Sequence, residues 1–409
     1  MLSAPDRRQA ESAEVPGRPR RRHRRLLVAL ATVLVLVVGA AGGIAWYFSG
    51  VALAVDHSES YPVRVLATPG SAGSGGQATV RLPRNRETAE AGLLGLAWAG
   101  GYGRVGPVVA ADPGSVTRAF TPVTGGVPAV GTRVRIDSFA NTGDPRTSLG
   151  LDFSEVRIPG PLGALPSWFV PVDPAPGTPA ASGAGRTWVV FLHGHDSHRQ
   201  ESLRYLTAWH ALGLPVLVPD YRDDLGAPAS PDGWHHLGDT EWQDADAAVR
   251  WAHDHGAQGV VLAGWSMGGA IALQTAHRSA LPGMIRGLLL DSPVVDWRDV
   301  FARQGADRGL PGPEITLAEW TLQWRAGISL DRLDWASRAK ELRVPTLIFH
   351  SDSDDYVPDG PALRLATARP DLVTLVRIPG ARHTLEWNVD PQRYEATERA
   401  WLGKLLPAA

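Results

Sequence analysis

Cysteine is absent from the 409 residues of this sequence. Its absence excludes disulfide bonds, thiolate metal sites and a cysteine nucleophile. A strong excess of either charge is also absent, since the formal net charge is −2 at pH 7. A nucleic-acid-binding protein usually carries a basic face, so we expect no nucleic-acid partner. The sequence is instead 44% hydrophobic, which predicts a packed core, and its 45 glycines and 33 prolines predict long irregular connections.

The longest apolar run lies near the N-terminus, at residues 26–48, and carries no charge. It directly follows the arginine-rich segment "RPRRRHRR" at 18–25. About 20 helical residues cross the hydrocarbon core of a bilayer. Trp46 and Tyr47 end the run, and aromatic rings of this kind favour the membrane interface. We therefore predict a transmembrane signal anchor over 26–48.

The arginines before the apolar run predict its orientation. Positive residues favour the cytoplasmic side, so residues 1–25 form a predicted basic cytoplasmic tail and the chain after residue 50 is extracytoplasmic. The alternative is a cleaved signal peptide, with "ALA" at 52–54 as the cleavage site. Cleavage near Ala54 would then release a secreted protein. We favour a single-pass protein of the cell membrane because the apolar run is longer than an ordinary signal-peptide core.

Two regions of different pattern follow the anchor. Residues 55–145 contain short β-like runs between Gly/Pro/Ser clusters and predict a small β-rich region without a recognisable catalytic constellation. Residues 150–407 alternate apolar, β-branched runs with helix-like segments, which predicts a doubly wound α/β domain with a mostly parallel sheet. The apolar runs lie at 187–194, 215–221, 259–265, 285–293, 344–352 and 372–380.

Two helical features are predicted within the α/β domain. The segment 240–256 has a threonine, Thr240, in the capping position, acidic residues in its first turn and a closing glycine. The connection 296–342 is much longer than usual for such a fold, and three of its four tryptophans lie in the stretch "EWTLQWRAGISLDRLDWASRA". We expect it to be an inserted, mostly helical cap. Its tryptophans either line an apolar acyl pocket or pack in the core.

The stretch "VVLAGWSMGGAIA" places Ser266 between an apolar run and a helix-like segment. Its "GWSMG" fits the pattern G-x-S-x-G, in which small residues allow a sharp strand-to-helix turn that exposes the serine, the nucleophile elbow. The alternative is a glycine-rich corner without chemistry. A serine hydroxyl needs a base to take its proton and an acid to orient that base. His383 follows the last apolar run, and three aspartates, Asp352, Asp354 and Asp355, follow the run before it.

These residues resemble a known family. The order serine, aspartate, histidine is that of the α/β-hydrolases, and "GWSMGG", "LLLDSP" and "PGARHT" are similar to motifs of exported or membrane-anchored bacterial serine hydrolases of the serine aminopeptidase and prolyl oligopeptidase-like group. The resemblance covers residues 150–407. The acid loop of such proteins commonly reads H-G-x-x-D-x-x-V-P, and its alignment with "HSDSDDYVP" selects Asp354, with Ser351 replacing the usual glycine. Asp291 is the alternative acid.

The negative charge that develops during acyl transfer needs backbone N–H donors. The residue after the nucleophile and one from the first strand–helix loop usually supply them, which points to Met267 and to His195, with "HG" at 193–194 resembling the motif of the family. The histidines His193, His195 and His198 also allow a metal site, but no carboxylate-bearing spacing accompanies them. We predict neither a metal nor another cofactor.

Together these features predict a serine hydrolase with Ser266, Asp354 and His383 as catalytic residues. The predicted substrate is a small-molecule carboxylic ester or other acyl compound, cleaved through an acyl-enzyme outside the cytoplasm. Amide hydrolysis by a peptidase is the alternative reaction, although no pair of glutamates for gripping a peptide amine is recognisable in the sequence. A non-catalytic binding module of the same fold is the alternative from a different class.

Overall fold

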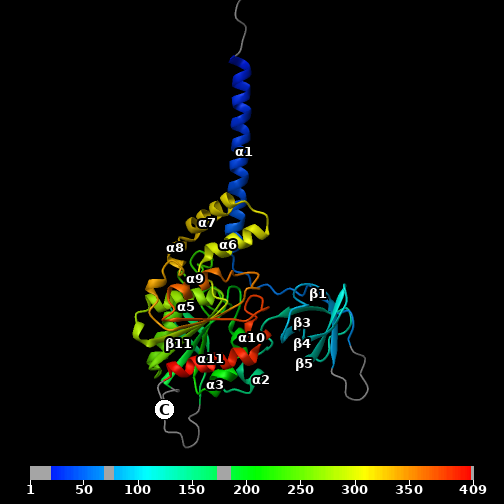
Figure 1. The fold of residues 1–409 in the computed structure, drawn as a ribbon, viewed down its shortest axis with the longest axis vertical. Coiled ribbons are helices and arrows are strands. Elements are labelled where there is room, and N and C mark those ends of the chain that lie inside the picture. Colours follow the sequence, from blue (N-terminus) through cyan, green and yellow to red (C-terminus); the bar gives the residue numbers. More distant parts are fainter. Residues whose placement is uncertain (1–19, 69–77, 173–185, 407–409) are drawn as a thin grey trace, which may run out of the picture.

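The computed structural model describes residues 20–68, 78–172 and 186–406. Its first element is α1 (Arg20–Leu53), which projects away from the rest of the molecule (Figure 1). Within the described residues, the part of α1 from His23 to Leu53 is the one helix that is long and apolar enough to cross a membrane, with a mean hydropathy of 2.6 in its most apolar stretch. None of that stretch is buried against the protein.

An antiparallel six-stranded sheet follows α1, in the strand order β1-β6-β3-β4-β5-β2. The chain after β1 also forms a bridge between Ala67 and Arg81 of β2, so the two edges of the sheet meet. Phe120, Val105 and Val134 are buried in its interior. The strands are β1 (Val63–Arg64), β2 (Thr79–Pro83), β3 (Leu94–Trp98), β4 (Gly101–Ala111), β5 (Ser115–Thr124) and β6 (Arg133–Asp137).

The larger sheet has eight strands in the order β14-β13-β12-β11-β9-β10-β8-β7. The first six strands in this order, β14 to β10, pair in parallel with their neighbours. The last two, β8 and β7, are antiparallel and form one edge of the sheet. The predicted fold class, a mostly parallel α/β sheet, is confirmed. The strands are β7 (Ser154–Pro159), β8 (Ala164–Val170), β9 (Thr187–Leu192), β10 (Val216–Pro219), β11 (Gly259–Trp265), β12 (Ile285–Asp291), β13 (Thr346–His350) and β14 (Val373–Arg377).

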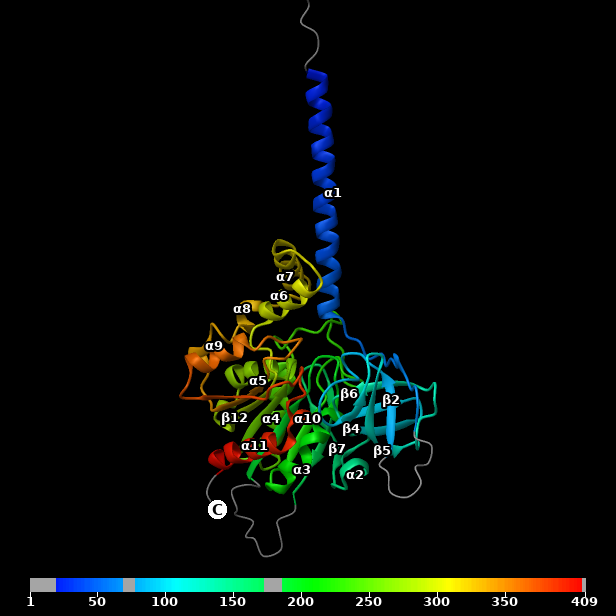
Figure 2. The ribbon, with the colours of Figure 1, turned by 45° about the vertical axis from the view of Figure 1, so that its right-hand side comes forward.

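Helices cover both faces of the larger sheet (Figures 1 and 2). Side chains of the central strands alternate between two cores: Val190 and Leu192 pack with α4 and α5 on one face, whereas Val189 and Phe191 pack with α3 and α11 on the other. Short helical segments complete this domain. The helices are α2 (Pro145–Leu149), α3 (Leu203–Ala211), α4 (Trp242–Asp254), α5 (Met267–Arg278), α9 (Gly360–Ala368), α10 (Glu386–Val389) and α11 (Pro391–Leu405).

One helix begins differently from the sequence prediction. Thr240 does not cap α4; the cap position is Glu241, whose side chain makes no capping hydrogen bond. Instead, the buried carboxylate of Glu241 accepts hydrogen bonds from the backbone N–H groups of His236, Gly238 and Thr240. The prediction was wrong because this longer side chain folds back on the preceding loop and satisfies its amides, which a threonine in the cap position could not reach.

The connection between β12 and β13 is helical. It contains α6 (Trp297–Asp307), α7 (Gly312–Ala326), α8 (Leu330–Leu333) and the short 3₁₀ helix η4 (Ala339–Glu341). We call α6 and α7 the cap. The cap lies between the sheet domain and the near end of α1, and α7 runs beside that end in both views (Figures 1 and 2).

Candidate active site

Ser266 lies between β11 and α5, at the end of a central strand. Its backbone has φ 52° and ψ −117°, a conformation that is costly for a residue with a side chain. Backbone hydrogen bonds hold this turn in place: the N–H of Ser266 donates to the carbonyl of Asp291 at 3.0 Å, and its own carbonyl accepts from Gly269 at 3.0 Å and Val294 at 3.1 Å. The predicted sharp turn is therefore present, and it directs the Ser266 side chain out of the sheet.

Close backbone packing around Ser266 explains why glycine occupies positions 264 and 268. A Cβ added to Gly264 would overlap the carbonyl oxygen of Gly268, and one added to Gly268 would overlap the carbonyl oxygen of Leu192. Helix α5 consequently begins in direct backbone contact with β9 and β11. Such close contact is possible only without side chains at these two positions.

His383 lies in the loop after β14 and contacts Ser266. The distance between His383 Nε2 and Ser266 Oγ is 2.9 Å, and His383 Nδ1 lies 2.9 Å from Asp354 Oδ2. Because Asp354 accepts at Nδ1, the neutral ring has its lone pair on Nε2, facing the serine hydroxyl. The structure thus brings together the three side chains that the sequence predicted as a set.

Asp354 is the carboxylate that reaches the histidine. Its Oδ1 accepts hydrogen bonds from the N–H groups of Tyr356 and Val357, both at 2.9 Å, which fix the side chain in its loop. The neighbouring candidates face elsewhere: Asp352 is exposed, and Asp355 pairs with Arg382 at 2.7 Å. The choice of Asp354 among the three aspartates of this loop agrees with the geometry.

The electrostatics of the histidine–aspartate pair favour the ionised carboxylate. Burial by itself lowers the pKa of His383, but the charge of Asp354 and its hydrogen bond outweigh burial, so the pKa lies above its ordinary value. Burial raises the pKa of Asp354, whereas the charge and hydrogen bond of His383 lower it, and the net pKa is below the ordinary value. The pair can therefore hold a positive imidazolium next to a negative carboxylate in a mostly buried site.

Asp291, the alternative acid, lies beneath the site. It is fully buried at the end of β12, beside Glu386. Burial raises the pKa of Asp291 to about 6 and, together with the charge of Asp291, raises the pKa of Glu386 well above its ordinary value. Ser292 links this pair to the histidine loop, since its hydroxyl donates to Glu386 at 2.9 Å and accepts from the N–H of Thr384 at 3.2 Å. Ser292 and Glu386 thus hold the loop that carries His383, and within the described residues no hydrogen bond joins Asp291 to the His383 ring.

The two predicted oxyanion donors lie on either side of the serine. Met267 is the first residue of α5, so its N–H has no acceptor within the helix. On the loop after β9, the Gly194 N–H donates to Glu201 Oε2 at 3.1 Å, which leaves the following amide, that of His195, as the candidate donor. This loop is close to the nucleophile, because a Cβ added to Gly194 would lie 3.4 Å from Ser266 Cβ.

Sequence reasoning missed two buried charges that connect the loops of the site. Glu201 accepts from Gly194 and, through Oε1, pairs with Arg204 at 3.2 Å. Arg204 in turn donates to the carbonyl of Thr384 at 2.9 Å and to Asn388 Oδ1 at 2.6 Å. The pair therefore ties the loop after β9 to the loop that carries His383. The sequence signal was weak, since "QESLRY" reads as an ordinary helix start.

The three histidines considered for a metal site do not converge in the described part of the chain. His193 Nε2 lies 2.8 Å from Asp224 Oδ2, and His195 Nδ1 lies 2.9 Å from Asp196 Oδ2. His198 belongs to neither group; its ring contacts Phe139 edge-on, and burial lowers its pKa to about 4. Among residues 20–68, 78–172 and 186–406, three groups have ligand atoms close enough to surround an ion: His193 with Asp220 and Asp224, His195 with Asp196 and His235, and His350 with Asp354 and Glu386. In the first two groups, hydrogen bonds between histidine and carboxylate explain why these atoms lie so close together.

The fold and this serine–histidine–aspartate arrangement define the protein as a serine hydrolase of the α/β-hydrolase fold. A solved structure with this fold, the Pyrococcus furiosus esterase Pf2001, superposes with a TM-score of 0.51 at 18% identity, over 64% of this chain and 94% of the esterase. The prolyl oligopeptidase family matches residues 202–408, half of the chain and the part that contains Ser266, Asp354 and His383. The chain belongs to the prolyl oligopeptidase family, in agreement with the resemblance seen in its motifs.

Relatives and a second domain match complete the comparison. An uncharacterized protein of Mycobacterium tuberculosis, Rv2307c, is 27% identical over 236 residues, which are 55% of this chain and 75% of the relative. The uncharacterized protein YqkD of Bacillus subtilis is 23% identical over 222 residues, 53% of this chain and 71% of the relative. A domain of unknown function, DUF8805, matches residues 64–137, which comprise the six-stranded sheet.

Proposed function

We propose that the protein is a membrane-anchored esterase whose catalytic residues are Ser266, His383 and Asp354. The observation that carries the proposal is the continuous hydrogen-bond chain from Ser266 Oγ through both ring nitrogens of His383 to Asp354. A serine on a strained strand-to-helix turn, a base within reach of its hydroxyl and an acid that orients the base are the parts that acyl transfer requires.

The proposed reaction proceeds in two steps. His383 Nε2 takes the proton of Ser266 as Oγ attacks the ester carbonyl, and Asp354 stabilises the imidazolium that forms. The imidazolium then donates this proton to the alcohol oxygen as the C–O bond breaks, which leaves the acyl group on Ser266. Water, deprotonated by His383, attacks the acyl-enzyme and releases the carboxylic acid. The N–H groups of Met267 and His195 stabilise the oxyanion in both steps.

The surroundings of His383 support an ester over a peptide substrate. A hollow beside His383 is lined by carboxylates of both domains, among them Glu90 and Asp355. Arg382 pairs with both, at 3.3 Å and 2.7 Å. Arg86 also pairs with Asp355, at 3.0 Å. Two guanidinium groups therefore engage these two carboxylates, which are not free to bind the amino terminus of a peptide. Amide hydrolysis, which the family name includes, is the alternative that the substrate test decides.

Labelling with a fluorophosphonate probe tests the nucleophile. We expect the wild-type protein to be labelled and Ser266→Ala to be unlabelled, because the probe reacts with an activated serine. Hydrolysis of p-nitrophenyl acetate should fall by about 10³-fold or more in Ser266→Ala. The matched control is Ser353→Ala, an exposed serine in the loop of Asp354, which should keep both labelling and hydrolysis.

The same preparations distinguish the alternatives. Equal labelling of wild type and Ser266→Ala would contradict the assignment of the nucleophile. Absence of labelling in the wild type would favour a non-catalytic binding module. Faster hydrolysis of an aminoacyl p-nitroanilide than of the acetate ester would favour a peptidase.

A further inference from the structure

An apolar pocket lies between the near end of α1, the cap and the catalytic domain. Its enclosed volume is about 120 Å³. Helix α1 and the two cap helices supply its walls: Phe48 and Val51 from α1, Phe301 from α6, and Ile315 and Leu322 from α7. Most of the area of this lining is hydrocarbon, with Gln304, Arg308 and Glu319 among its polar groups, so the pocket fits a mainly apolar ligand.

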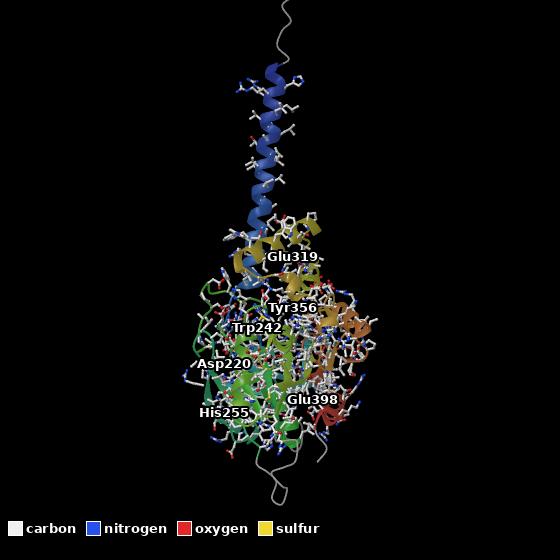
Figure 3. All side chains as sticks on the ribbon, turned by 90° about the vertical axis from the view of Figure 1, so that its left-hand side faces the viewer. Asp220, Trp242, His255, Glu319, Tyr356 and Glu398 are labelled. Carbon is white, nitrogen blue, oxygen red and sulfur yellow. The ribbon has the colours of Figure 1, made fainter. Side chains whose placement is uncertain are left out.

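The pocket leads to the candidate active site. His195 and Tyr356 belong to its lining. His195 carries the candidate oxyanion amide, and the ring of Tyr356 lies 5.2 Å from the ring of His383. Figure 3 shows Glu319 of α7 above Tyr356, and both residues line the pocket. An acyl chain whose carbonyl is attacked by Ser266 can therefore extend past Tyr356 into the space under the cap.

The outer side of the same elements is suited to a bilayer surface. About 20 residues of α1 before Trp46 span about 30 Å, the thickness of a hydrocarbon core. Trp46 and Tyr47 follow, with 52% and 64% of their surfaces exposed. On α7, Trp320 and Trp324 are 65% and 76% exposed, and the rings of Trp324 and Trp46 lie 6.3 Å apart. Four exposed aromatic rings on two adjacent helices at the end of an apolar span are typical of a membrane interface.

Arg325 joins α1 to the cap at this level. Its Nη1 donates to the carbonyl of Trp46 and to the hydroxyl of Ser49, both at 2.8 Å. Its guanidinium also lies 4.0 Å from the ring centroid of Trp46, in a cation–π contact. The cap is thus fixed to the helix at the point where the helix leaves the predicted bilayer, and the pocket begins directly below.

We propose that this pocket binds the long acyl chain of a bilayer lipid ester, which enters from the membrane surface between α1 and α7. The inference rests on the proposed function, because Ser266 is the residue that attacks the ester. The Ser266 Oγ–acyl bond forms as the ester C–O bond breaks; the alcohol leaves with the proton from His383, and water later releases the fatty acid. Each methylene of the chain that moves from water into the pocket strengthens binding, so long esters are preferred over short ones.

Filling the pocket tests the inference on the full chain in phosphatidylcholine vesicles. Ala318 lines the pocket, whereas Thr316, two residues earlier on α7, is exposed and does not. In the wild type, kcat/KM for p-nitrophenyl palmitate should exceed that for p-nitrophenyl acetate. We expect Ala318→Trp to lower this ratio at least about tenfold, and Thr316→Trp to leave it unchanged. Equal ratios in all three proteins would overturn the inference while hydrolysis itself upheld the esterase.

A binding measurement separates the pocket from the chemistry. Cis-parinaric acid, a fluorescent fatty acid, should bind Ser266→Ala and Ser266→Ala/Thr316→Trp but not Ser266→Ala/Ala318→Trp. This pattern without any ester hydrolysis by the wild type would refute the proposed function and retain the acyl pocket. Absence of binding to Ser266→Ala would refute the pocket.

A further variant tests whether the ester enters the pocket from the bilayer. Trp320→Ser/Trp324→Ser removes two exposed rings that do not line the pocket. We expect it to lower the rate for palmitate ester in vesicles relative to the same ester in detergent micelles by severalfold. An unchanged ratio between the two presentations would contradict entry from the membrane.

Discussion

His383 is held from both sides, and its protonation controls the proposed reaction. The general base must be neutral at Nε2 to accept the proton of Ser266. The pKa of His383 is raised because Asp354 stabilises the imidazolium more than burial destabilises it. Protonation of His383 thus competes with catalysis at a higher pH than for an ordinary histidine, whose pKa is about 6.5.

The pH dependence of ester hydrolysis should reflect this shift. We expect kcat/KM to rise with pH through an apparent pKa above about 6.5. In Asp354→Asn the charge that raises the pKa is lost and burial remains, so the rising limb should move to lower pH. The plateau should fall by about 10⁴-fold, because the ring is no longer held in its productive tautomer.

The control for this substitution is Asp352→Asn, which changes an exposed aspartate of the same loop. It should keep the profile and plateau of the wild type. If Asp354→Asn retained the wild-type profile, the orienting role of Asp354 would be wrong, and Asp291 would be the carboxylate to test next.

Much of the candidate site could be predicted from the sequence, since Ser266, Asp354 and His383 each follow an apolar strand and the carboxyl ends of parallel strands meet at one edge. Glu201 and Arg204 could not be predicted. Their partners Thr384 and Asn388 lie about 180 residues further along the chain, and no local pattern indicates that a buried charge will find them.

Loss of Arg204 should destabilise the protein strongly. Arg204→Met leaves the buried carboxylate of Glu201 without its cation, which costs about 3–5 kcal/mol in the free energy of unfolding. Denaturant unfolding in detergent measures the change. Arg303→Met is the control, since Arg303 forms an exposed pair with Asp307 and its loss should cost below about 1 kcal/mol. Similar effects of the two variants would contradict a structural role for Arg204.

The close packing at the junction of β11 and α5 depends on glycine. We expect Gly264→Ala to lower the free energy of unfolding by about 3 kcal/mol or more, because its Cβ would lie 2.6 Å from the carbonyl carbon of Gly268. Gly403→Ala in α11 is the matched control: nothing lies within 4 Å of its added Cβ, so it should stabilise the helix by about 0.5–1 kcal/mol. Thermal unfolding of both variants provides the comparison, and equal midpoints would contradict the steric role of Gly264.

The order of strands and helices in the α/β domain could be read from the sequence because each buried parallel strand is a continuous apolar run. The six-stranded sheet was predicted less completely. The β-like runs "YPVRVLA", "ATVRLP", "GRVGPVVAA" and "TRVRIDSF" predict β1, β2, β4 and β6, whereas β3 and β5 were not predicted. β3 is fully buried but reads "LGLAW", with glycine and alanine among its residues. It forms a hairpin with β4, and its other edge pairs with β6, which lies much further along the chain. Such pairing leaves no local signal.

Contacts between segments distant in the sequence join the six-stranded sheet, the α/β domain and α1 into one molecule. Asn388 donates to the carbonyls of Leu93 and Ser138 and so attaches the six-stranded sheet to α10, the helix that follows the His383 loop. Arg325 attaches the cap to α1. The end of α1 also forms a wall of the pocket, so cleavage near Ala54 would remove Phe48 and Val51 from that wall. The proposed acyl pocket therefore requires an uncleaved anchor.

The absence of cysteine allows a direct test of the proposed topology. Single cysteines at Ser12, in the N-terminal tail, and at Ser154, exposed on β7, can each be probed with a membrane-impermeant maleimide in intact bacterial cells. Because the arginines at 18–25 favour the cytoplasmic side, Ser154→Cys should be labelled in intact cells and Ser12→Cys only after permeabilisation. The cysteine-free wild type is the background control. Labelling of Ser12→Cys in intact cells would reverse the orientation, and a shortened Ser154→Cys product in the medium would indicate cleavage, which would detach the domain from the bilayer that the pocket requires.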